Sequence, residues 1–599
     1  MLMDIEKKIA EAVSGILLKE TGQAFPPGGI ELQKTRREFE GDFTLVVFPF
    51  VKALRRSPEQ CAAFIGEALS EQVEELASFN VIKGFLNLSL KPFFWLGFLK
   101  KEMNRSDFGL QANSGNARVV VEFSSPNTNK PLHLGHIRNN LLGYSVAKIL
   151  EGAGHKVMRV NLVNDRGIHI CKSMLAWMKF GNGETPGSSG KKGDKLVGEY
   201  YVRFEAELKV QARDLVLHKG LDEEAARRQA PLMVEAQELL RKWEQKDPET
   251  LSVWEEMNGW VYKGFDITYQ RLGVSFDKIY YESDTYLLGK ELVLEGLRNG
   301  LLIKKEDGSV WADLSDEGLD EKLLLRADGT SVYMTQDLGT AQLRYDDFKP
   351  RQMVYVVGNE QNYHFDVLQK VLKKLGKPYA DSIYHLSYGM VELPGGKMKS
   401  REGTVVDADD LMDKMFETAR RTTEELGKTN DFSAEEKERL YHVIGLGALK
   451  YFILKVDPKK NMLFNPEESI DFNGHTGPFI QYTFARIRSI LRTAGPDRLE
   501  AIDPAPDPAQ INQKEIALLK TLFAFPACVV EAAEELSPAK IANYVYELCK
   551  EFNQFYHDYS VLNEPDIRLS DFRLKLAQLT ATAIGNGMAL LGIDVPERM

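Results

Sequence analysis

The chain has 599 residues with ordinary hydrophobic and charged content, which is typical of a globular protein of several domains. Its net charge of −11 disfavours a general nucleic-acid binder, so nucleic-acid contacts would need local basic patches. Four scattered cysteines without Cys-x-x-Cys spacing disfavour disulfides and structural zinc, and indicate a reducing, cytoplasmic location. We expect neither a signal peptide nor a membrane span, because no apolar run of ~18 residues is evident.

The first part of the chain, residues 1–115, is predicted to form a small α+β domain. Its expected helices lie near 3–20 and 57–78, and its expected strands lie near 44–48 and 85–90. A polar, glycine-bearing run at 106–116 is predicted to be a linker to the next domain.

Two histidines stand at the turn of a predicted strand–helix–strand unit that covers residues 118–163. A buried-strand pattern ends at Phe123, and apolar residues then recur at helical spacing from Ile137. His133 and His136 lie around Gly135 at the expected start of this helix, where free N–H groups attract phosphate. Both imidazoles could donate to phosphate oxygens, and Gly135 would let a flat adenine approach the backbone.

The His-x-Gly-His string alone is also consistent with ordinary core or surface histidines. A metal pair is less favoured, because no third ligand stands at the usual spacing. Pro131 is expected in the first helical turn, where its missing N–H has no intrahelical partner. The preceding strand and following helix favour the nucleotide site.

The middle of the chain, residues 116–405, is predicted to be a Rossmann-like parallel-sheet domain with insertions near 181–260 and 285–330. Residues 181–195 are rich in glycine, but they lack P-loop spacing and are interpreted as a flexible surface loop. A second strand at 352–358 leads into polar residues and another helix. Open α/β sheets bind ligands at such strand ends.

A second candidate anion site is the glycine-flanked basic loop at 393–406. Lys397, Lys399 and Arg401 could offset the charge of a triphosphate. Flanking glycines would let such a loop close over a nucleotide. By itself the loop is better interpreted as a solvated hairpin turn. Its combination with the histidine element and an intervening α/β pattern is much rarer by chance. From 406 to 599 the pattern is helical, with a proline-rich connector at 495–508.

These motifs resemble the two ATP-binding motifs of class I aminoacyl-tRNA synthetases. Over essentially its whole length the chain resembles the arginyl-tRNA synthetases. The stretches that carry the resemblance are 121–127, 130–136, 164–167, 193–203, 333–339 and 474–482. This resemblance implies that the chain makes arginyl-adenylate from L-arginine and ATP with Mg²⁺. It would then pass the arginyl group to tRNA(Arg), with release of AMP and pyrophosphate.

The resemblance also implies roles for particular residues. ATP binding and catalysis would fall to His133, Gly135, His136, Lys397, Met398 and Arg401, with Lys130 as an additional catalytic residue. Arginine binding would fall to Glu122, Asn127, Tyr333, Asp337 and Gln361. Contacts with tRNA would fall to Tyr482, Arg488 and Met599. No protein residue is expected to ligate a metal ion.

The second motif departs from the usual Lys-Met-Ser-Lys-Ser pattern. Here it reads Lys397-Met-Lys-Ser-Arg401, so Ser400 stands where a second lysine is usual. We hypothesise that Lys130 supplies the missing positive charge. The resemblance further implies that the N-terminal domain grips the tRNA elbow and that residues 406–599 form an all-α anticodon-binding domain.

Three other readings remain to be compared with this one. A cysteine-specific class I synthetase would need a zinc–thiolate site, which the scattered cysteines disfavour. A small-metabolite adenylyltransferase would not need the helical C-terminal part. A catalytically inactive tRNA-binding paralogue is disfavoured by the intact motif residues. We expect a monomer.

Overall fold

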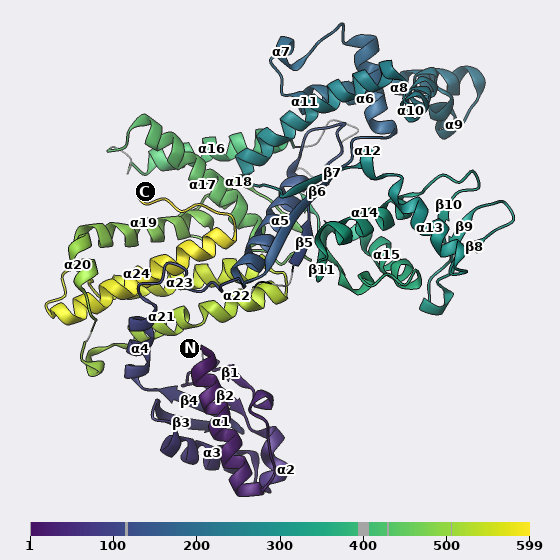
Figure 1. Cartoon of the computed structure of the whole chain (residues 1–599). Coiled ribbons are helices and arrows are strands. Elements are labelled where there is room, and N and C mark those ends of the chain that lie inside the picture. Colours follow the sequence, from purple (N-terminus) through teal and green to yellow (C-terminus); the bar gives the residue numbers. More distant parts are fainter. Residues whose placement is uncertain are drawn as a thin grey trace.

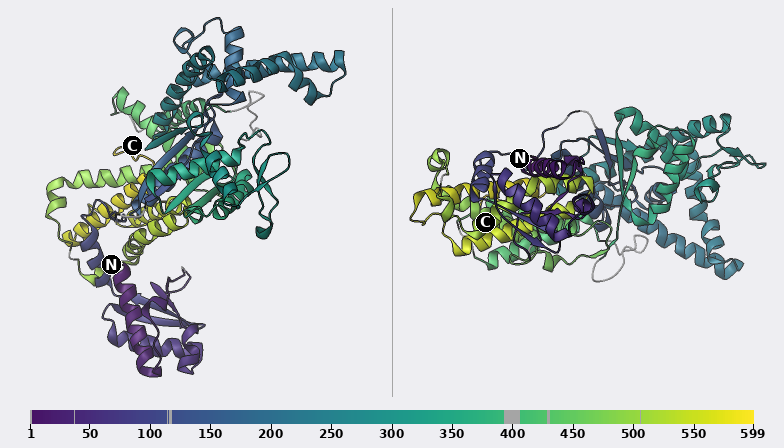
Figure 2. Two further views of the ribbon diagram at one scale, coloured as in Figure 1. Left: turned by 45° about the vertical axis from the view of Figure 1, so that its right-hand side comes forward. Right: turned by 90° about the horizontal axis from the view of Figure 1, so that it is seen from below.

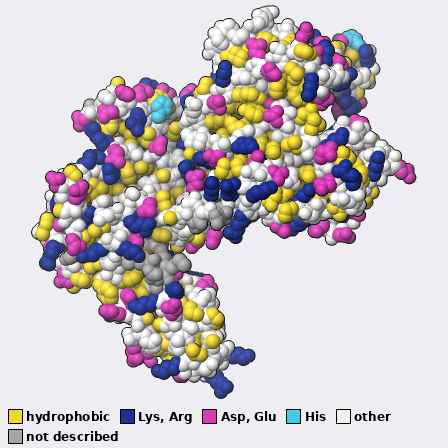
Figure 3. Space-filling view, in the orientation of Figure 1, with side chains coloured by type: hydrophobic (Ala, Val, Ile, Leu, Met, Phe, Trp, Pro, Cys, Tyr) yellow, Lys and Arg dark blue, Asp and Glu magenta, His cyan; other side chains and the backbone are white. Residues whose placement is uncertain are grey.

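The computed structural model describes residues 2–36, 38–113, 115, 118–392, 406–427, 431–504 and 506–599. An N-terminal α+β domain lies at one end of the molecule and meets a helical C-terminal domain, and a parallel-sheet domain lies on the far side of that bundle (Figures 1 and 2). On the face shown in Figure 3, acidic and basic side chains are interspersed over all parts of the chain. The predicted fold class is confirmed.

The N-terminal domain is built on a four-stranded antiparallel sheet in the order β1-β2-β4-β3. Ser57 caps the second long helix of the domain by accepting from the backbone N–H of Gln60. The elements are α1 (Leu2–Thr21), β1 (Leu32–Lys34), β2 (Phe43–Val46), α2 (Val51–Leu54), α3 (Pro58–Gln72), β3 (Leu76–Ile82), β4 (Phe85–Leu90) and α4 (Pro92–Glu102).

The central domain has a five-stranded parallel sheet in the order β12-β11-β5-β6-β7. Alternate residues of each strand face opposite sides, so Val119 and Val121 enter one hydrophobic core and Val120 enters the other. The strand order reverses between β5 and β11, which is where open α/β sheets bind ligands. The strands are β5 (Arg118–Glu122), β6 (Lys156–Val163), β7 (Lys278–Tyr281), β11 (Gln352–Gly358) and β12 (Ile383–Tyr388).

Helices cover both faces of this sheet. The helix α5 (Leu134–Gly152) packs on one face against β5, β6 and β11. The helices α14 (Tyr333–Phe348) and α15 (Asn362–Lys374) border the other core. Gly143 lets α5 approach β5, since a Cβ there would lie 2.3 Å from the ring of Phe123.

Two insertions interrupt the sheet, one between β6 and β7 and one between β7 and β11. The first is helical and follows β6, and the second carries a three-stranded sheet in the order β10-β9-β8. The first contains α6 (Ile168–Phe180), α7 (Pro186–Ser189), α8 (Gly193–Lys219), α9 (Glu223–Gln229), α10 (Pro231–Glu244) and α11 (Pro248–Leu272). The second contains α12 (Glu282–Thr285), α13 (Leu288–Arg298), β8 (Ile303–Lys304), β9 (Val310–Ala312) and β10 (Lys322–Leu325).

The C-terminal domain is a helical bundle tied to the sheet domain by the short parallel pair β13 (Val391–Glu392) and β14 (Met462–Leu463). Buried Arg138 of α5 reinforces this junction by donating to the backbone oxygens of Met390, Pro458 and Lys460. The helices are α16 (Ala408–Glu425), α17 (Ala434–Leu454), α18 (Pro466–Ser469), α19 (Gly477–Ala494), α20 (Pro496–Ala501), α21 (Gln513–Phe523), α22 (Phe525–Glu534), α23 (Pro538–Asp558) and α24 (Ile567–Leu590).

Several local predictions were wrong. The helix expected at 57–78 ends at Gln72, because the chain turns there into β3. The loop expected at 181–195 contains α7 and the start of α8. The connector at 495–508 contains α20, which begins with a proline at its first helical position.

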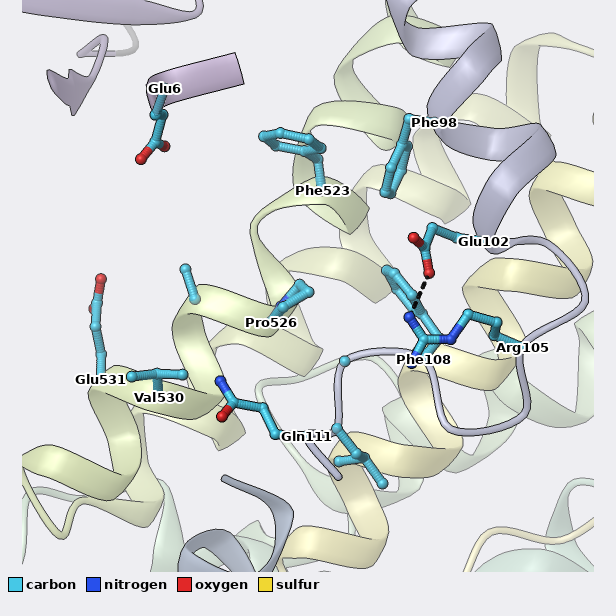
Figure 4. Close-up of a pocket in the computed structure, with 13 residues that line it drawn as sticks. Glu6, Phe98, Glu102, Arg105, Phe108, Gln111, Phe523, Pro526, Val530 and Glu531 are labelled. Carbon is cyan, nitrogen blue, oxygen red and sulfur yellow. Dashed lines mark hydrogen bonds and ion pairs between the residues drawn. The ribbon is translucent and has the colours of Figure 1, made fainter. Parts of the chain in front are cut away.

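The run at 106–116 is not an exposed linker over its described residues. Phe108 is only 1% exposed, and its ring packs against Phe98 of α4 and Phe525 of α22. Phe523 of α21 contacts Phe98 as well. Figure 4 shows the rings of Phe98, Phe108 and Phe523 beside a cavity of about 480 Å³ at the junction. An ion pair between Lys520 and Asp42 ties the N-terminal domain to α21. A second ion pair joins Lys100 of α4 to Asp503 at 2.8 Å. Aromatic packing and these ion pairs therefore dock the N-terminal domain on the bundle.

One described stretch, Gln513–Glu534, is long and apolar enough to cross a membrane by length and composition alone. The sequence-based expectation that the chain has no apolar run long enough for a membrane span was therefore wrong by length and composition. The stretch is divided into α21 and α22, and nearly half of its most apolar window is buried among neighbouring helices. Core helices of bundles commonly pass the same test.

Candidate active site

Shortly after the end of β5, two residues have left-handed backbone conformations, Ser124 (φ 78°) and Ser125 (φ 45°). Such conformations cost about 1–3 kcal/mol each and need support from their surroundings. The backbone N–H of Ser124 donates to Asn139 at 2.5 Å, and that of Ser125 donates to Asn161 at 3.0 Å. Asn139 also donates to the backbone oxygen of Val356 in β11, at 2.7 Å. This network braces the sheet where its strand order reverses.

The two histidines form a reciprocal cap at the start of α5. His133 is the N-cap residue, and its Nδ1 accepts from the backbone N–H of Gly135 at 3.1 Å. In return, Nδ1 of His136 accepts from the backbone N–H of His133 at 3.2 Å. The helix begins at Leu134, so Pro131 lies before it and the expectation that Pro131 belongs to its first turn was wrong.

This cap determines the chemical state of both rings. A nitrogen that accepts from a backbone N–H carries no proton, so each neutral ring must carry its proton on Nε2. Burial, reinforced by nearby Lys130, lowers the pKa of His133 to about 3. Burial and the neighbouring His133 hold the pKa of His136 well below its ordinary value. Both imidazoles are therefore neutral Nε2–H donors at physiological pH.

The histidines line a cavity of about 320 Å³ above β5 and β11. The cavity lies at the strand-order reversal, where open α/β sheets bind ligands. Its described lining residues are Ser124, Ser125, His133, Gly135, His136, Asn139, Val356, Val357, Tyr388, Met390 and Val391.

The start of α16 pairs with the histidine segment. The backbone N–H of Leu134 donates to Val406 at 3.1 Å, and that of Ala408 donates to Leu132 at 2.9 Å. These bonds bracket His133. The predicted loop residues Lys397, Met398 and Arg401 lie outside the described residues.

A second, larger cavity of about 810 Å³ lies beside the ends of β5 and β6. Three predicted arginine-binding residues line it: Asn127, Tyr333 and Asp337. Tyr333 is 80% exposed at the start of α14, and Asp337 lies one helical turn further on. The carboxylate Oδ2 of Asp337 lies 2.6 Å from Nε2 of His364, which orients it.

Two residues of this larger cavity were missed by sequence reasoning. Glu282 directly follows β7, and burial raises the pKa of its carboxyl group to about 7. Arg166 follows β6, lies 3.9 Å from Glu282, and stacks 4.0 Å from the ring centre of Tyr286. Both residues could have been found from the sequence, because each comes shortly after the carboxyl end of a strand of the parallel sheet. Glu282 was overlooked because the strand at 278–281 was not recognised.

Two other predicted arginine-binding residues lie elsewhere. Glu122 is buried at the end of β5, where it forms an ion pair with buried Arg344 of α14. Burial would lower the pKa of Arg344, but the adjacent carboxylate outweighs that effect and raises it. Gln361 is exposed after β11. Among the described lining residues of the two cavities, neither Glu122 nor Gln361 occurs.

Lys130 lies half-buried before the histidine segment, and burial lowers its pKa. Its Cα lies against α8, since a Cβ at Gly198 would be 3.4 Å away. Its charge is close enough to lower the pKa of both histidines.

The three predicted tRNA contacts lie together in the helical domain. The ring of Tyr482 on α19 lies 4.8 Å below the guanidinium of Arg486. Arg488 donates from Nε to Glu597 at 2.6 Å, which holds the C-terminal tail against α19. Met599 is half-buried and packs against the bundle core.

Family models match three parts of the chain. The model described as "tRNA synthetases class I (R), catalytic domain" matches residues 102–465, more than half of the chain. The models "Arginyl tRNA synthetase N terminal domain" and "DALR anticodon binding domain" match residues 3–90 and 480–599. The chain belongs to the arginyl-tRNA synthetase family.

Full-length relatives agree with this assignment. The arginine–tRNA ligase of Bacteroides fragilis is 56% identical over 598 residues, and that of Porphyromonas gingivalis is 54% identical over 600. Each alignment covers 100% of both chains. The arginyl-tRNA synthetase of Thermus thermophilus superposes with a TM-score of 0.80 at 27% identity, covering 98% of this chain and 99% of that one. The Plasmodium falciparum enzyme, at 21% identity and a TM-score of 0.76, shares the fold.

The chain is therefore an arginine–tRNA ligase. It uses ATP to form arginyl-adenylate and transfers the arginyl group to its tRNA. The cysteine-specific, metabolite-transferring and inactive readings have no support among these relatives.

Replacement of His133 by asparagine separates its helix-capping role from its role as a donor. Asparagine is among the preferred N-cap residues, so the thermal midpoint at pH 7.5 should change little. Loss of one positioned donor should lower the rate of adenylate formation about a hundredfold or more. Pre-steady-state measurement of adenylate formation would test this. A near-normal rate would contradict the role of His133 as a donor to phosphate.

The same variant tests the protonation state. The folded-state pKa of His133 lies below its ordinary value of 6.5, so the unfolded chain binds more protons between these values. Stability is therefore lost as pH falls through this window. Asparagine cannot titrate, so the variant should lose less of its thermal midpoint between pH 7.5 and pH 5.5. An equal loss in both proteins would contradict the assignment.

Proposed function

We propose that the two cavities divide the two small substrates between them. ATP binds in the smaller cavity, with its phosphates at His133 and His136. L-Arginine binds in the larger one, with its guanidinium at Asp337. The reciprocal histidine cap carries the first assignment, because it leaves two neutral Nε2–H donors at a helix start in a cavity at the strand-order reversal.

Two carboxylates support arginine binding in the larger cavity. A guanidinium is a planar set of donors that carboxylates bind well. Asp337, oriented by His364, and Glu282 both line this cavity, and their charges interact. A bound guanidinium would favour the ionised form of Glu282, whose pKa is raised by burial in its absence. Asn127 and Tyr333 line the same cavity. In this proposal Asn127 holds the α-amino or carboxylate group of the substrate, and Tyr333 covers it.

The reaction needs no enzyme nucleophile. The carboxylate oxygen of arginine attacks the α-phosphorus of ATP, the bond to the bridging oxygen breaks, and pyrophosphate leaves with the electron pair. The terminal ribose 2′-hydroxyl of the tRNA then attacks the arginyl carbonyl, and AMP leaves. Catalysis rests on alignment of the reactants and on donors at the phosphate oxygens.

We propose that Mg²⁺ reaches the site with ATP. Among the described residues there is no cluster of three or more His, Cys, Asp or Glu that could hold a metal ion. Mg²⁺ commonly keeps several waters and binds through substrate phosphates. The ion would offset phosphate charge there, and we assign no protein ligand to it.

The phosphate charge must also be offset by lysine or arginine. We propose that Lys130 provides part of this charge, because it lies near both histidines and is desolvated by burial. Lys397 and Arg401 remain candidates for this charge, and Met398 for ATP binding, on sequence resemblance alone. For Glu122 we propose indirect support of the arginine site through Arg344, and for Gln361 a contact with the substrate's carboxylate or amino group.

The tRNA contacts remain proposals as well. We propose that Tyr482 and Met599 contact splayed anticodon bases and that Arg488 contacts backbone phosphate, since single-stranded loops are read by stacking and ion pairing. The N-terminal domain would grip the tRNA elbow. We further propose that the enzyme is a cytoplasmic monomer, that it is not bound to a membrane, and that adenylation needs bound tRNA.

Replacement of Asp337 by asparagine tests the arginine site. ATP–pyrophosphate exchange with each amino acid, at saturating tRNA, should show that only arginine supports exchange in the unchanged enzyme. The variant should raise the KM for arginine about thirtyfold or more and leave the KM for ATP nearly unchanged, because a charged hydrogen bond is lost. Asp346→Asn, on the same helix but exposed, is the matched control. Equal effects on both KM values would contradict the assignment.

Replacement of Lys130 by alanine tests its role as a phosphate partner. The adenylation rate at saturating ATP should fall about tenfold or more, because one charge near the departing pyrophosphate is removed. The exposed Lys156, at the opposite edge of the sheet, offers a control with the same loss of charge. A rate for Lys130→Ala within a few-fold of that of Lys156→Ala would exclude this role.

A further inference from the structure

The sequence shares the stretch at 193–203 with the arginyl-tRNA synthetases. No residue of this stretch is among the described lining residues of the two proposed substrate cavities. It forms the start of α8 in the first insertion. This helix start lies between the long helix α11 and the first turn of α16. Polar residues at and just before this helix start join Arg271 of α11 and acidic residues of α16. Among the described residues, they form the most extensive charged network between the insertion and the helical domain.

Lys192, directly before α8, is at the centre of this network. Its Nζ donates to Thr268 of α11 at 2.6 Å and lies 3.1 Å from Asp194. It also forms an ion pair with Asp409 of α16. Asp409 accepts from Thr268 at 2.9 Å and from Arg271 at 2.8 Å. One carboxylate of α16 is thus held by three donors from the insertion.

The network is largely removed from solvent. The side chains of Lys192, Asp194 and Asp409 are 18%, 0% and 16% exposed. Backbones also approach closely here, because a Cβ at Gly193 would lie 2.2 Å from the backbone oxygen of Trp260. In such surroundings the loss of one partner leaves an uncompensated charge, which is far more disruptive than the loss of an exposed pair.

Two contacts connect this network to the histidine segment. The first is the backbone pairing of residues 406 and 408 with residues 134 and 132, which brackets His133. Asp409 follows Ala408 directly in the first turn of α16. The second is the packing of α8 on the segment itself, since a Cβ at Gly198 would lie 2.8 Å from the ring of Pro131. The network therefore borders the His133 segment from two sides.

We propose that Lys192 and Asp409 are positioning residues for adenylate formation. They fix the start of α16 against the insertion, and α16 in turn fixes His133 through the short backbone pairing. Neither side chain touches a substrate in this account. The inference rests on the proposed assignment of ATP to the smaller cavity.

The test compares Lys192→Met with Lys195→Met in the full-length enzyme. Methionine keeps an apolar stem and removes the charge. Lys195 lies on the same helix and pairs with Asp410 of α16 at 3.4 Å, but both of these side chains are exposed, so its loss should matter little. ATP–pyrophosphate exchange at saturating tRNA would give the KM for ATP, the KM for arginine and kcat for each variant.

We expect Lys192→Met to raise the KM for ATP at least about tenfold, with the KM for arginine within about twofold of the unchanged enzyme. Lys195→Met should leave both within about twofold. Lys192→Arg should restore most of the ATP affinity, because it keeps the charge. Equal changes in both KM values, or no change in either, would overturn the proposal.

A double-mutant cycle with Asp409→Asn covers the case in which Lys192→Met folds poorly. Asparagine keeps the shape and one acceptor, so the variant should fold. The effects of the two substitutions on the KM for ATP should be strongly non-additive if the two side chains act as a pair. Additive effects would overturn the proposal. If His133→Asn leaves the KM and the rate for ATP unchanged, the assignment of the cavity fails instead.

Discussion

The reciprocal bond between the two histidines and the backbone at the start of α5 is the interaction on which the site depends. Nδ1 of each ring accepts a hydrogen bond from a backbone N–H. These two bonds cap the helix and leave only Nε2 of each ring as a donor. Burial keeps both rings neutral, so their donor role does not change with pH near neutrality. One arrangement therefore stabilises the helix, fixes the tautomers and aims two donors at the cavity. A surface pair of histidines would provide none of these properties reliably.

The sheet explains why residues distant in sequence meet at this place. Parallel strands carry their carboxyl ends to one edge, and the reversal of strand order between β5 and β11 opens a crevice there. The histidines lie in that crevice, and Asn127, Glu282 and Asp337 line the neighbouring cavity at the same edge. The helical domain is held to this edge by β13–β14, by Arg138 and by the network around Lys192.

The sequence predicts the parts that depend on local patterns. Valine-rich strands, the histidine turn and the helical C-terminal part were all predicted from periodicity and motif, and the fold class is confirmed. Long-range pairing was not predictable. Glu122 reads as an available carboxylate in the sequence, yet Arg344, more than 200 residues later, occupies it. Glu282 follows a strand too short to recognise, and Phe108 is buried because rings of α4 and α22 pack against it. His133 was expected within a helix, but an imidazole cap has no strong sequence signal.

The protonation state of the two histidines tests this account most directly. Nitrogen NMR of the enzyme labelled with ¹⁵N only in histidine reports which ring nitrogen carries the proton, and His133→Asn identifies the signals of that ring. The account predicts that both rings remain neutral Nε2–H tautomers from about pH 8 to about pH 5.5, although free histidine titrates near 6.5. A proton on Nδ1 of either ring, or a titration midpoint near 6.5 for either ring in the folded enzyme, would contradict it.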